Sequence, residues 1–334
     1  MALKAGLDQA LDKPPRQPYN FTVRNAISRY EMAFPKETLP VHSNHPARKY
    51  QVRSVERALS LLRTFLAHDG ELSAAELSKE NGLDPSTVFR LLATLETQGF
   101  VEINHATAKY RPGVILLELG SRFLKNNDIR SRSIGYLERL RDEFGETVHL
   151  TILDGNEVVY LEKLAGLHPI GFMSSRVGDR NPAHCTGVGK ALLAYLSDEE
   201  LARRYPHGRL KRYTDQTITD LDELRADLAR VRKRGYAIDL EEHEVGVKCV
   251  AAPTFDHKEV AAAVSVSGPA DRMDDHIAND DLINKLMEAA AQISEQMGWG
   301  RGVDQLKDVR SPAKGKRPVA PRAKAVVERV RRGA

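Results

Sequence analysis

The sequence predicts an α+β protein in which an N-terminal winged helix-turn-helix precedes a larger domain with helices packed on a sheet. Two observations support this prediction. Between residues 54 and 111, three short amphipathic segments with helix-start signals are followed by two strand-like runs around a turn. From residue 146 to residue 298, strand-like and helix-like segments alternate irregularly, as in a sheet covered by helices.

Length and composition exclude several classes of protein. The chain has 334 residues, 41% hydrophobic and 29% charged, which suits two or three domains and is too apolar for a wholly disordered protein. No apolar run approaches the ~18 residues of a membrane helix, and the first residues lack the layout of a signal peptide. We therefore expect a cytoplasmic protein with no membrane partner. Two cysteines are too few for a disulfide framework or a four-thiolate zinc site.

The first predicted helix follows Ser54, a residue type that caps helix N-termini. Apolar residues then recur at helical spacing, which predicts one buried stripe along the helix. The stripe consists of Val55, Leu59, Leu62 and Leu66, with Ala58, Leu61 and Phe65 alongside. Asp69-Gly70 ends the segment.

Two more helices follow, each with its own start signal. Ser73 and Glu76 form a capping box, in which each side chain satisfies a free backbone N–H group of the other residue. Asp84 caps the third helix, and Pro85 stands in its first turn, where the missing N–H has no cost. Gly99 ends this helix. Its predicted buried residues are Val88, Leu91, Leu92 and Leu95.

A strand hairpin over residues 100–111 and a further apolar helix from Val114 to Leu124 complete this region. Three short helices followed directly by a hairpin form a winged helix-turn-helix. The third helix of such a unit fits the major groove of double-stranded DNA, and its first turns present side chains to base edges.

The positions of the third helix outside its apolar stripe carry short hydroxyl residues and one long cation. Hydroxyl groups reach phosphates or bases, and an arginine binds guanine through two hydrogen bonds. A lysine in the hairpin is placed to contact the DNA backbone. The predicted DNA-binding residues are Ser86, Thr87, Arg90, Thr94 and Lys109. The alternative is a winged helix that binds a protein partner, because such modules also serve that role.

Several segments of the larger region resemble one known family. These segments are His184 to Ala194, Arg234 to Asp239, Gly246 to Cys249, Ala251 to Pro253 and Ser265 to Pro269, together with Val52 to Leu59 near the start of the first helix. The sequence resembles the IclR-type bacterial transcription regulators over about residues 50–298. The resemblance implies a winged helix-turn-helix, a linker helix and a C-terminal GAF-like domain that senses a small-molecule effector. It also implies a homodimer or tetramer that acts as a repressor of a small-molecule catabolic operon.

The resemblance further implies an effector site made by a glycine loop, an aspartate, a cysteine and two serines. The matching positions here are Gly187, Val188, Asp239, Cys249, Ser265 and Ser267. Loop N–H groups and hydroxyls can hold a small organic acid or an aromatic carbonyl compound, with Val247 and Met173 as an apolar wall. Judged on their own, the two serines fit a polar sheet face equally well. Cys249 alone fits an inert core thiol, and Asp239 alone fits a residue that caps a turn.

The sequence predicts no catalytic residue, no cofactor and no metal site. Gly187 to Lys190 departs from a phosphate-binding loop, because His184 replaces its first glycine and Ala191 follows the lysine. Lys190 is therefore predicted to be a surface or interface charge. His184 and Cys185 are adjacent in the sequence, and adjacent residues seldom place a base within reach of a nucleophile. Two such residues are also too few to bind zinc.

Charge divides the chain unevenly. Residues 126–300 carry 22 Lys or Arg against 30 Asp or Glu, whereas residues 301–334 carry 11 against 3. We predict that the basic tail attracts phosphate without recognising a sequence. The predicted organisation is an extended segment over 1–47, a DNA-binding domain over 48–112, a linker helix over 113–126, an effector-binding domain over 127–300 and a disordered tail over 301–334.

Overall fold

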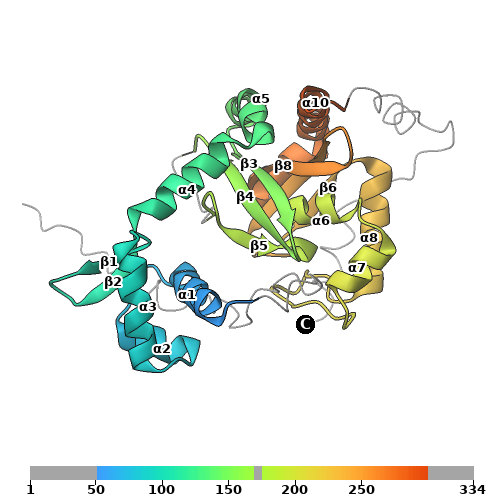
Figure 1. Ribbon diagram of the computed structural model, residues 1–334. Coiled ribbons are helices and arrows are strands. Elements are labelled where there is room, and N and C mark those ends of the chain that lie inside the picture. The colour runs from blue at the N-terminus through green and yellow to red at the C-terminus, as the bar shows by residue number, and fades with distance from the viewer. Residues whose placement is uncertain (1–50, 169–174, 300–334) are drawn as a thin grey trace, which may run out of the picture.

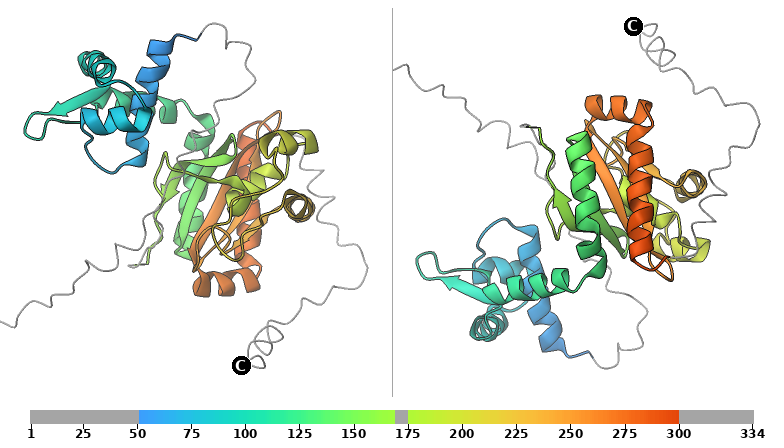
Figure 2. Two further views of the ribbon diagram at one scale, coloured as in Figure 1. Left: turned by 90° about the horizontal axis from the view of Figure 1, so that it is seen from below. Right: turned by 90° about the horizontal axis from the view of Figure 1, so that it is seen from above.

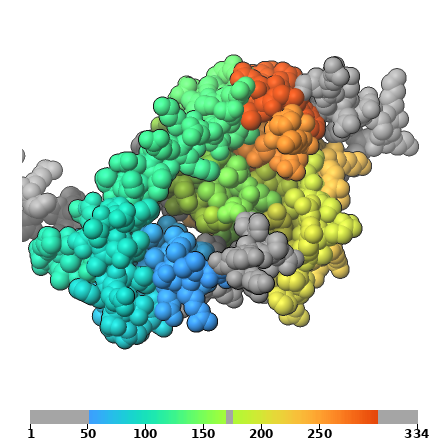
Figure 3. Space-filling view, in the orientation of Figure 1, coloured from blue at the N-terminus to red at the C-terminus, as the bar shows by residue number. Residues whose placement is uncertain are grey.

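The computed structural model describes residues 51–168 and 175–299. It consists of two lobes joined by helix α4 (Val114–Lys125), which crosses from one lobe to the other (Figure 1) and lies between them in the space-filling view (Figure 3). The predictions for residues 1–47 and 301–334 and for Met173 lie outside the described residues.

The smaller lobe is a winged helix-turn-helix, which confirms the predicted element order. Its core is built from apolar residues of all three helices and of the hairpin, including Leu61, Leu77, Leu92 and Tyr110. The elements are α1 (Arg53–Thr64), a 3₁₀ turn (Phe65–Ala67), α2 (Ala74–Asn81), α3 (Pro85–Thr97), β1 (Val101–Asn104) and β2 (Lys109–Pro112).

Two predictions for the first helix are wrong. Helix α1 begins one residue before Ser54, with Val52 as an N-cap that makes no side-chain hydrogen bond. The helix contacts the core through Leu61, with the partly buried Ala58 and Leu62 beside it, while Val55 and Leu59 are each 54% exposed. The apolar residues of α1 therefore cover two faces of the helix, of which only one packs against other residues that the structure describes. The sequence pattern does not distinguish the two faces, because both carry apolar residues at helical spacing.

The start signals of the next two helices are confirmed. Ser73 and Glu76 form both hydrogen bonds of the capping box, and α2 ends at Gly82, which is in the left-handed conformation at φ +59°. Asp84 accepts a hydrogen bond from the backbone N–H of Thr87, which fixes the first turn of α3. Strands β1 and β2 pair antiparallel and form the predicted wing.

Helix α5 (Asp128–Phe144), which follows the linker, is absent from the sequence prediction. Its start and end were nevertheless encoded in the sequence. Asn127 caps the helix by accepting the backbone N–H of Arg130 at 3.1 Å, and Gly145 ends it at φ +69°. Its buried residues follow helical spacing and include Leu137 and Leu140.

The larger lobe contains a six-stranded antiparallel sheet with the strand order β5-β4-β3-β8-β7-β6. The strands are β3 (Thr147–Asp154), β4 (Glu157–Leu164), β5 (Arg180–Pro182), β6 (Ala237–Leu240), β7 (Val247–Phe255) and β8 (Val260–Pro269). All of them lie within residues 146–298, where the sequence predicts a sheet with helices packed on it.

Helices cover both faces of this sheet. Helices α5 and α10 (Asp281–Gln296) lie side by side on one face, above a core that includes Leu150, Val250 and Val264 (Figure 2). The opposite face carries α6 (Gly187–Leu193), with α8 (Leu221–Arg234) packed against it, above Ala251 and Ala263. The 3₁₀ turn Ala183–Cys185 and the helices α7 (Asp198–Arg204) and α9 (Ala270–Ala278) complete the lobe.

Candidate functional site

Helix α3 carries four of the five predicted DNA-binding residues, and the fifth, Lys109, lies on β2. Val88 and Leu92 are fully buried, and Leu95 is nearly so, which fixes the rotation of the helix about its axis. The exposed side carries Ser86, Phe89, Arg90, Ala93, Thr94, Glu96 and Thr97, and all of these except Glu96 are here called the recognition face. The structure therefore brings three of the predicted residues together on one surface, with Thr87 partly buried at its edge.

The hydroxyl groups of the recognition face donate their protons locally. Ser86 Oγ donates to the carboxylate of Asp84 at 2.5 Å. Thr94 Oγ1 donates to the carbonyl of Arg90 at 2.9 Å. These hydroxyls retain acceptor lone pairs, so they can accept a hydrogen bond from a base amino group but are not free donors to phosphate.

On the recognition face, Arg90 and Phe89 are the groups left for outside contacts. Within the described part of the chain, no hydrogen bond or ion pair engages the Arg90 guanidinium. Phe89 is 63% exposed, although phenylalanine is among the side chains most often buried. Phe89 was not among the predicted DNA-binding residues, because it is apolar and is adjacent to Val88 of the buried stripe. Its place one residue outside that stripe was the available signal.

The two cations of the wing have acidic neighbours. Lys109 Nζ lies 3.8 Å from the carboxylate of Glu76 on α2, with both side chains largely exposed. Arg111 pairs with Glu102 across the hairpin at 3.0 Å. Exposed pairs of this kind are weak, so Lys109 can exchange Glu76 for a phosphate at little cost.

The predicted effector residues in the larger lobe are centred on the N-terminus of α6. Thr186 caps this helix by accepting the backbone N–H of Gly189 at 3.3 Å. A side chain at Gly187 would collide with the sulfur of Cys249, and one at Gly189 with the carbonyl of Ala183. Glycine at position 187 therefore lets α6 lie directly on β7, and glycine at position 189 lets the 3₁₀ turn Ala183–Cys185 pack against the same helix.

Three neighbouring strands place the remaining predicted residues in a row. Asp239 on β6 is the register partner of Cys249 on β7, and Cys249 is the partner of Ser267 on β8. Gly187 lies against the Cys249 sulfur, and the neighbouring Ser267 side chain and Gly187 backbone lower the pKa of the Cys249 thiol, although burial outweighs both. Ser265 lies two residues along on the same face of β8. All of these residues are buried, whereas Val247, the predicted wall, is half-buried at the end of β7.

Burial controls the charge of this site. Burial and the neighbouring Glu242 carboxylate raise the pKa of Asp239 to about 7, so this carboxyl takes up a proton near neutral pH. Burial also raises the pKa of the Cys249 thiol to about 12, which keeps the sulfur neutral. Asp239 additionally accepts the backbone N–H of Glu242 at 2.8 Å, so it also performs the turn-capping role.

The structure adds a histidine to the same face of the sheet. His149 on β3 is the register partner of Ser265, and its ring stands edge-on to Tyr160 on β4 with ring centres 5.0 Å apart. Its Nε2 lies 3.0 Å from the hydroxyl of Ser175. Burial lowers the pKa of His149 to about 3, so the ring is neutral. The alternation of Thr147, His149 and Thr151 was the signal for this polar row.

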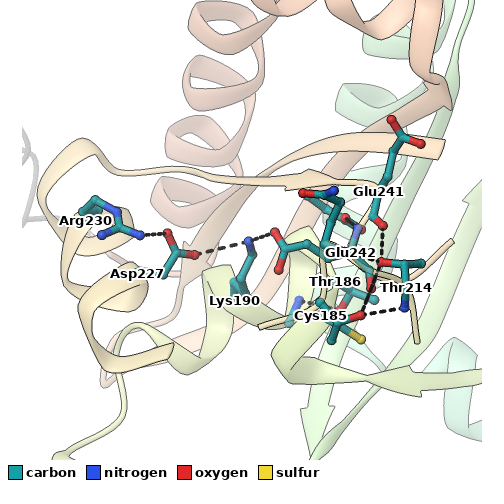
Figure 4. A network of polar contacts seen from close by, with 12 residues as sticks. Cys185, Thr186, Lys190, Thr214, Asp227, Arg230, Glu241 and Glu242 are labelled. Carbon is teal, nitrogen blue, oxygen red and sulfur yellow. Dashed lines mark hydrogen bonds and ion pairs between the residues drawn. The ribbon is translucent and has the colours of Figure 1, made fainter. Parts of the chain in front are cut away.

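The prediction that Lys190 is a surface or interface charge is wrong. The Lys190 side chain is 2% exposed and forms ion pairs with Glu242 and with Asp227, the latter at 3.2 Å (Figure 4). Asp227 in turn pairs with Arg230 at the surface. Burial by itself lowers the pKa of Lys190, but the two carboxylates more than offset it, so the pKa is raised and the ammonium stays charged. The network ties α6, α8 and the β6–β7 loop together.

Cys185 and His184 are not arranged for nucleophilic chemistry. The sulfur of Cys185 lies 3.9 Å from the carbonyl of Pro182, while His184 Nε2 lies 2.9 Å from the carbonyl of Lys211. Burial raises the pKa of the Cys185 thiol well above its ordinary value, which disfavours the reactive thiolate. Over residues 51–168 and 175–299, no cluster of three or more His, Cys, Asp or Glu side chains is placed to hold a metal ion. No helix in these ranges is long and apolar enough to cross a membrane.

Comparison with known domain families gives two matches in the order of the two lobes. Residues 54–104 match the IclR helix-turn-helix domain, and residues 121–295 match the C-terminal domain of the bacterial transcriptional regulator IclR. The chain belongs to the IclR family of bacterial transcriptional regulators. Members of the IclR family bind DNA through the winged helix-turn-helix, and the expected α+β fold with a linker helix is confirmed.

Individual IclR relatives match over most of their length. The transcriptional regulator XynR of Escherichia coli is 39% identical over 251 residues, which cover 74% of this chain and 98% of XynR. The transcriptional repressor IclR of Escherichia coli is 37% identical over 255 residues, covering 75% and 92% of the two chains. An IclR homologue from Microbacterium hydrocarbonoxydans, solved in complex with 4-hydroxybenzoate, is 26% identical with a TM-score of 0.64 and covers 74% and 100% of the two chains.

Proposed function

We propose that this protein is a ligand-responsive repressor of a small-molecule catabolic operon, and that its effector is a small organic acid or aromatic compound. The observation that carries the proposal is the convergence of Gly187, Asp239, Cys249 and Ser267 on one buried sheet face at the start of α6. Buried polar groups that gather at a helix N-terminus are suited to a small polar ligand.

The chemistry of these groups favours a ligand that carries a carboxyl or carbonyl group. The backbone N–H groups at the start of α6 and the hydroxyls of Ser265 and Ser267 are hydrogen-bond donors. Protonation of Asp239 near pH 7 removes the charge that would repel an anion. The IclR homologue of Microbacterium hydrocarbonoxydans binds 4-hydroxybenzoate, a compound with both an aromatic ring and a carboxylate. This relative supports the proposed effector class.

We further propose that two copies of the chain act together. Val55 and Leu59 on α1 and Leu117 and Phe123 on α4 are large apolar side chains, each at least half exposed. Large exposed apolar side chains of this kind are typical of protein interfaces, and α1 and α4 both belong to the part of the chain that carries the winged helix. A homodimer, alone or paired into a tetramer, would present two α3 helices to a near-palindromic operator.

The alternative, a winged helix that binds a protein partner, is disfavoured by the composition of the recognition face. Apart from Phe89, this face offers short hydroxyl residues and Arg90. The core of a protein interface is usually richer in large apolar side chains. The repressor function of the curated relative IclR also favours DNA.

The test uses the purified full-length protein to identify both the DNA sequence and the small molecule that it binds. Duplexes are selected by the protein from a random-sequence pool, and a panel of small aliphatic and aromatic acids, including 4-hydroxybenzoate, is screened by thermal shift. We expect one near-palindromic sequence to be enriched and at least one acid to raise the unfolding temperature, because a ligand of the folded state stabilises it. If no sequence is enriched, the DNA-binding part of the proposal is contradicted. If no acid in the panel changes the unfolding temperature, the effector part is contradicted.

A further inference from the structure

Phe89 is an unusual side chain on the recognition face. It is 63% exposed, while the other exposed positions of α3 carry small, polar or charged residues. Over the described residues, no other aromatic ring and no cation stacks on it. A large apolar side chain left in water gains free energy when a partner covers it, so the position indicates a contact outside the chain.

The rotation of α3 decides where this contact lies. The buried residues Val88 and Leu92 hold the opposite side of the helix against the core. Phe89 is three residues after Ser86 and next to Arg90, in the N-terminal half of the helix. In helix-turn-helix proteins, this half is the part of the recognition helix that meets base edges. The ring therefore belongs to the surface that would face the major groove.

The neighbours of Phe89 narrow the kind of contact it can make. Ser86 and Thr94 donate their hydroxyl protons to Asp84 and to the carbonyl of Arg90. Thr97 donates in the same way to the carbonyl of Ala93. The groups that remain free to contribute a new interaction are the Arg90 guanidinium and the Phe89 ring. The guanidinium recognises hydrogen-bond acceptors, and the ring recognises apolar surface.

The major groove contains one prominent apolar group, the C5-methyl of thymine, and phenylalanine is among the side chains that contact it. We propose that Phe89 determines operator specificity by packing its ring on the C5-methyl of one thymine in each half-site, close to a guanine bound by Arg90. This inference rests on the proposed DNA-binding function and names the base that the recognition face selects.

The test removes the methyl group from the DNA and the ring from the protein. Operator duplexes selected from the random pool are synthesised with each thymine replaced in turn by deoxyuridine, which lacks only the C5-methyl. For the wild-type protein, we expect about a fourfold loss of affinity at one thymine per half-site, the factor expected for burial of one methyl group. Phe89→Ala should bind the thymine duplex more weakly, by at least that factor, and be indifferent to deoxyuridine at the same position.

Two control variants separate this contact from general effects. Phe89→Leu keeps an apolar side chain at the position and should retain part of the deoxyuridine penalty. Val245→Ala removes another exposed apolar side chain, in the β6–β7 loop of the larger lobe, and should retain the full penalty. Because Phe89 is exposed, its replacement leaves no cavity, and unchanged unfolding temperatures should verify that each variant is folded.

Each other outcome overturns the proposal. If Phe89→Ala keeps the full penalty, or if the wild-type protein shows no sensitive thymine, the ring does not contact a methyl group. If light scattering shows that Phe89→Ala lowers the oligomeric state, Phe89 packs against a second copy of the chain instead. If the wild-type protein selects no duplex at all, the proposed DNA-binding function fails, a result distinct from the loss of thymine sensitivity alone.

Discussion

Single residues in this protein gain their properties from burial and from one or two neighbours. Asp239 is an ordinary carboxyl in the sequence, but the sheet buries it beside Glu242 and raises its pKa to about 7. Arg90 has the opposite situation, because α3 leaves its guanidinium exposed and without a partner among the described residues. The fold therefore sets the properties of both groups, by burying Asp239 and by leaving Arg90 exposed.

The first prediction at this scale concerns Arg90. Arg90→Ala should weaken binding to the selected operator by ~1–3 kcal/mol, while binding to random DNA changes less, because a guanidinium that binds guanine loses sequence-specific hydrogen bonds. Fluorescence anisotropy with both duplexes measures the difference. Arg203→Ala, which removes an exposed arginine from α7 in the other lobe, is the matched control. Equal losses on operator and random DNA would contradict base recognition by Arg90.

The second prediction concerns pH. Below pH 7 Asp239 is largely protonated, and above pH 7 its negative charge opposes an anionic ligand, so affinity for a carboxylate effector should fall as pH rises from 6 to 8. The fall can reach about tenfold per pH unit once Asp239 is ionised. Burial lowers the pKa of His149 to about 3 and of His243 to about 4, so neither titrates in this window. The remaining ionisable neighbours are Glu242, Lys190, Cys185, Cys249 and Tyr160.

Calorimetry of the wild type and of Asp239→Asn across this pH range provides the test. The variant should bind the same acid with nearly constant affinity, because its amide does not titrate. An uncharged amide analogue of the acid serves as the ligand control and should show less dependence on pH. A wild-type affinity that stays constant from pH 6 to 8 would exclude Asp239 from contact with the ligand carboxylate.

At the scale of elements, buried charge and apolar faces determine which helices meet. Lys190 on α6 is enclosed between Asp227 on α8 and Glu242 in the β6–β7 loop (Figure 4). This network joins the helix whose first turn carries the glycine loop to the segment that follows Asp239. Helices α1 and α4, in contrast, each leave an apolar face without a partner within the described chain.

Removal of the buried lysine should be costly. Lys190→Met keeps most of the side-chain volume but leaves the carboxylate of Glu242 buried without its cation and Asp227 paired only with Arg230. We expect a loss of about 3–5 kcal/mol in the free energy of unfolding, the usual effect of breaking a buried ion pair from one side. Arg230→Ala removes only the exposed partner of Asp227 and should cost less than about 1 kcal/mol. Urea unfolding measures both, and similar losses in the two variants would contradict the account.

The exposed face of α1 gives a second prediction at this scale. Leu59→Asp should shift the protein from dimer to monomer in light scattering, because a carboxylate cannot be buried in an apolar interface without a large desolvation cost. Operator affinity should fall with it, since two α3 helices then no longer bind as a unit. Val245→Asp introduces the same charge at an exposed apolar position in the β6–β7 loop and should leave the oligomeric state unchanged. A dimeric Leu59→Asp would place the interface elsewhere.

These elements also show how far sequence reasoning extends. The capping box at Ser73, the Asp84-Pro85 helix start and the strand alternation are local signals, and the structure confirms each of them. The rotation of α1 and the burial of Lys190 are not local. They depend on which surfaces other elements cover, and a lysine at helical spacing looks the same whether its ammonium meets water or two distant carboxylates. His149 was missed for the same reason, because its polar neighbours come from other strands.

At the scale of the whole molecule, the two lobes separate the two proposed binding functions. Helix α4 is the covalent link between the winged helix and the sheet, and α5, which follows it, packs on the sheet face opposite α6 (Figure 2). For an effector to control DNA binding, it must have different affinities for the DNA-bound and DNA-free arrangements of the protein. The acidic balance of residues 126–300 is consistent with a sensor lobe that stays away from phosphate.

The central claim, that the site at α6 controls the recognition face of α3, is tested by titrating the acid found in the thermal-shift screen into the protein–operator complex. For the wild type, we predict a saturable, at least fivefold change in operator affinity. The double variant Ser265→Ala/Ser267→Ala should bind the operator as the wild type does in the absence of the acid but lose this response. Operator affinity that is independent of the acid in the wild type, or an undiminished response in the double variant, would contradict the account.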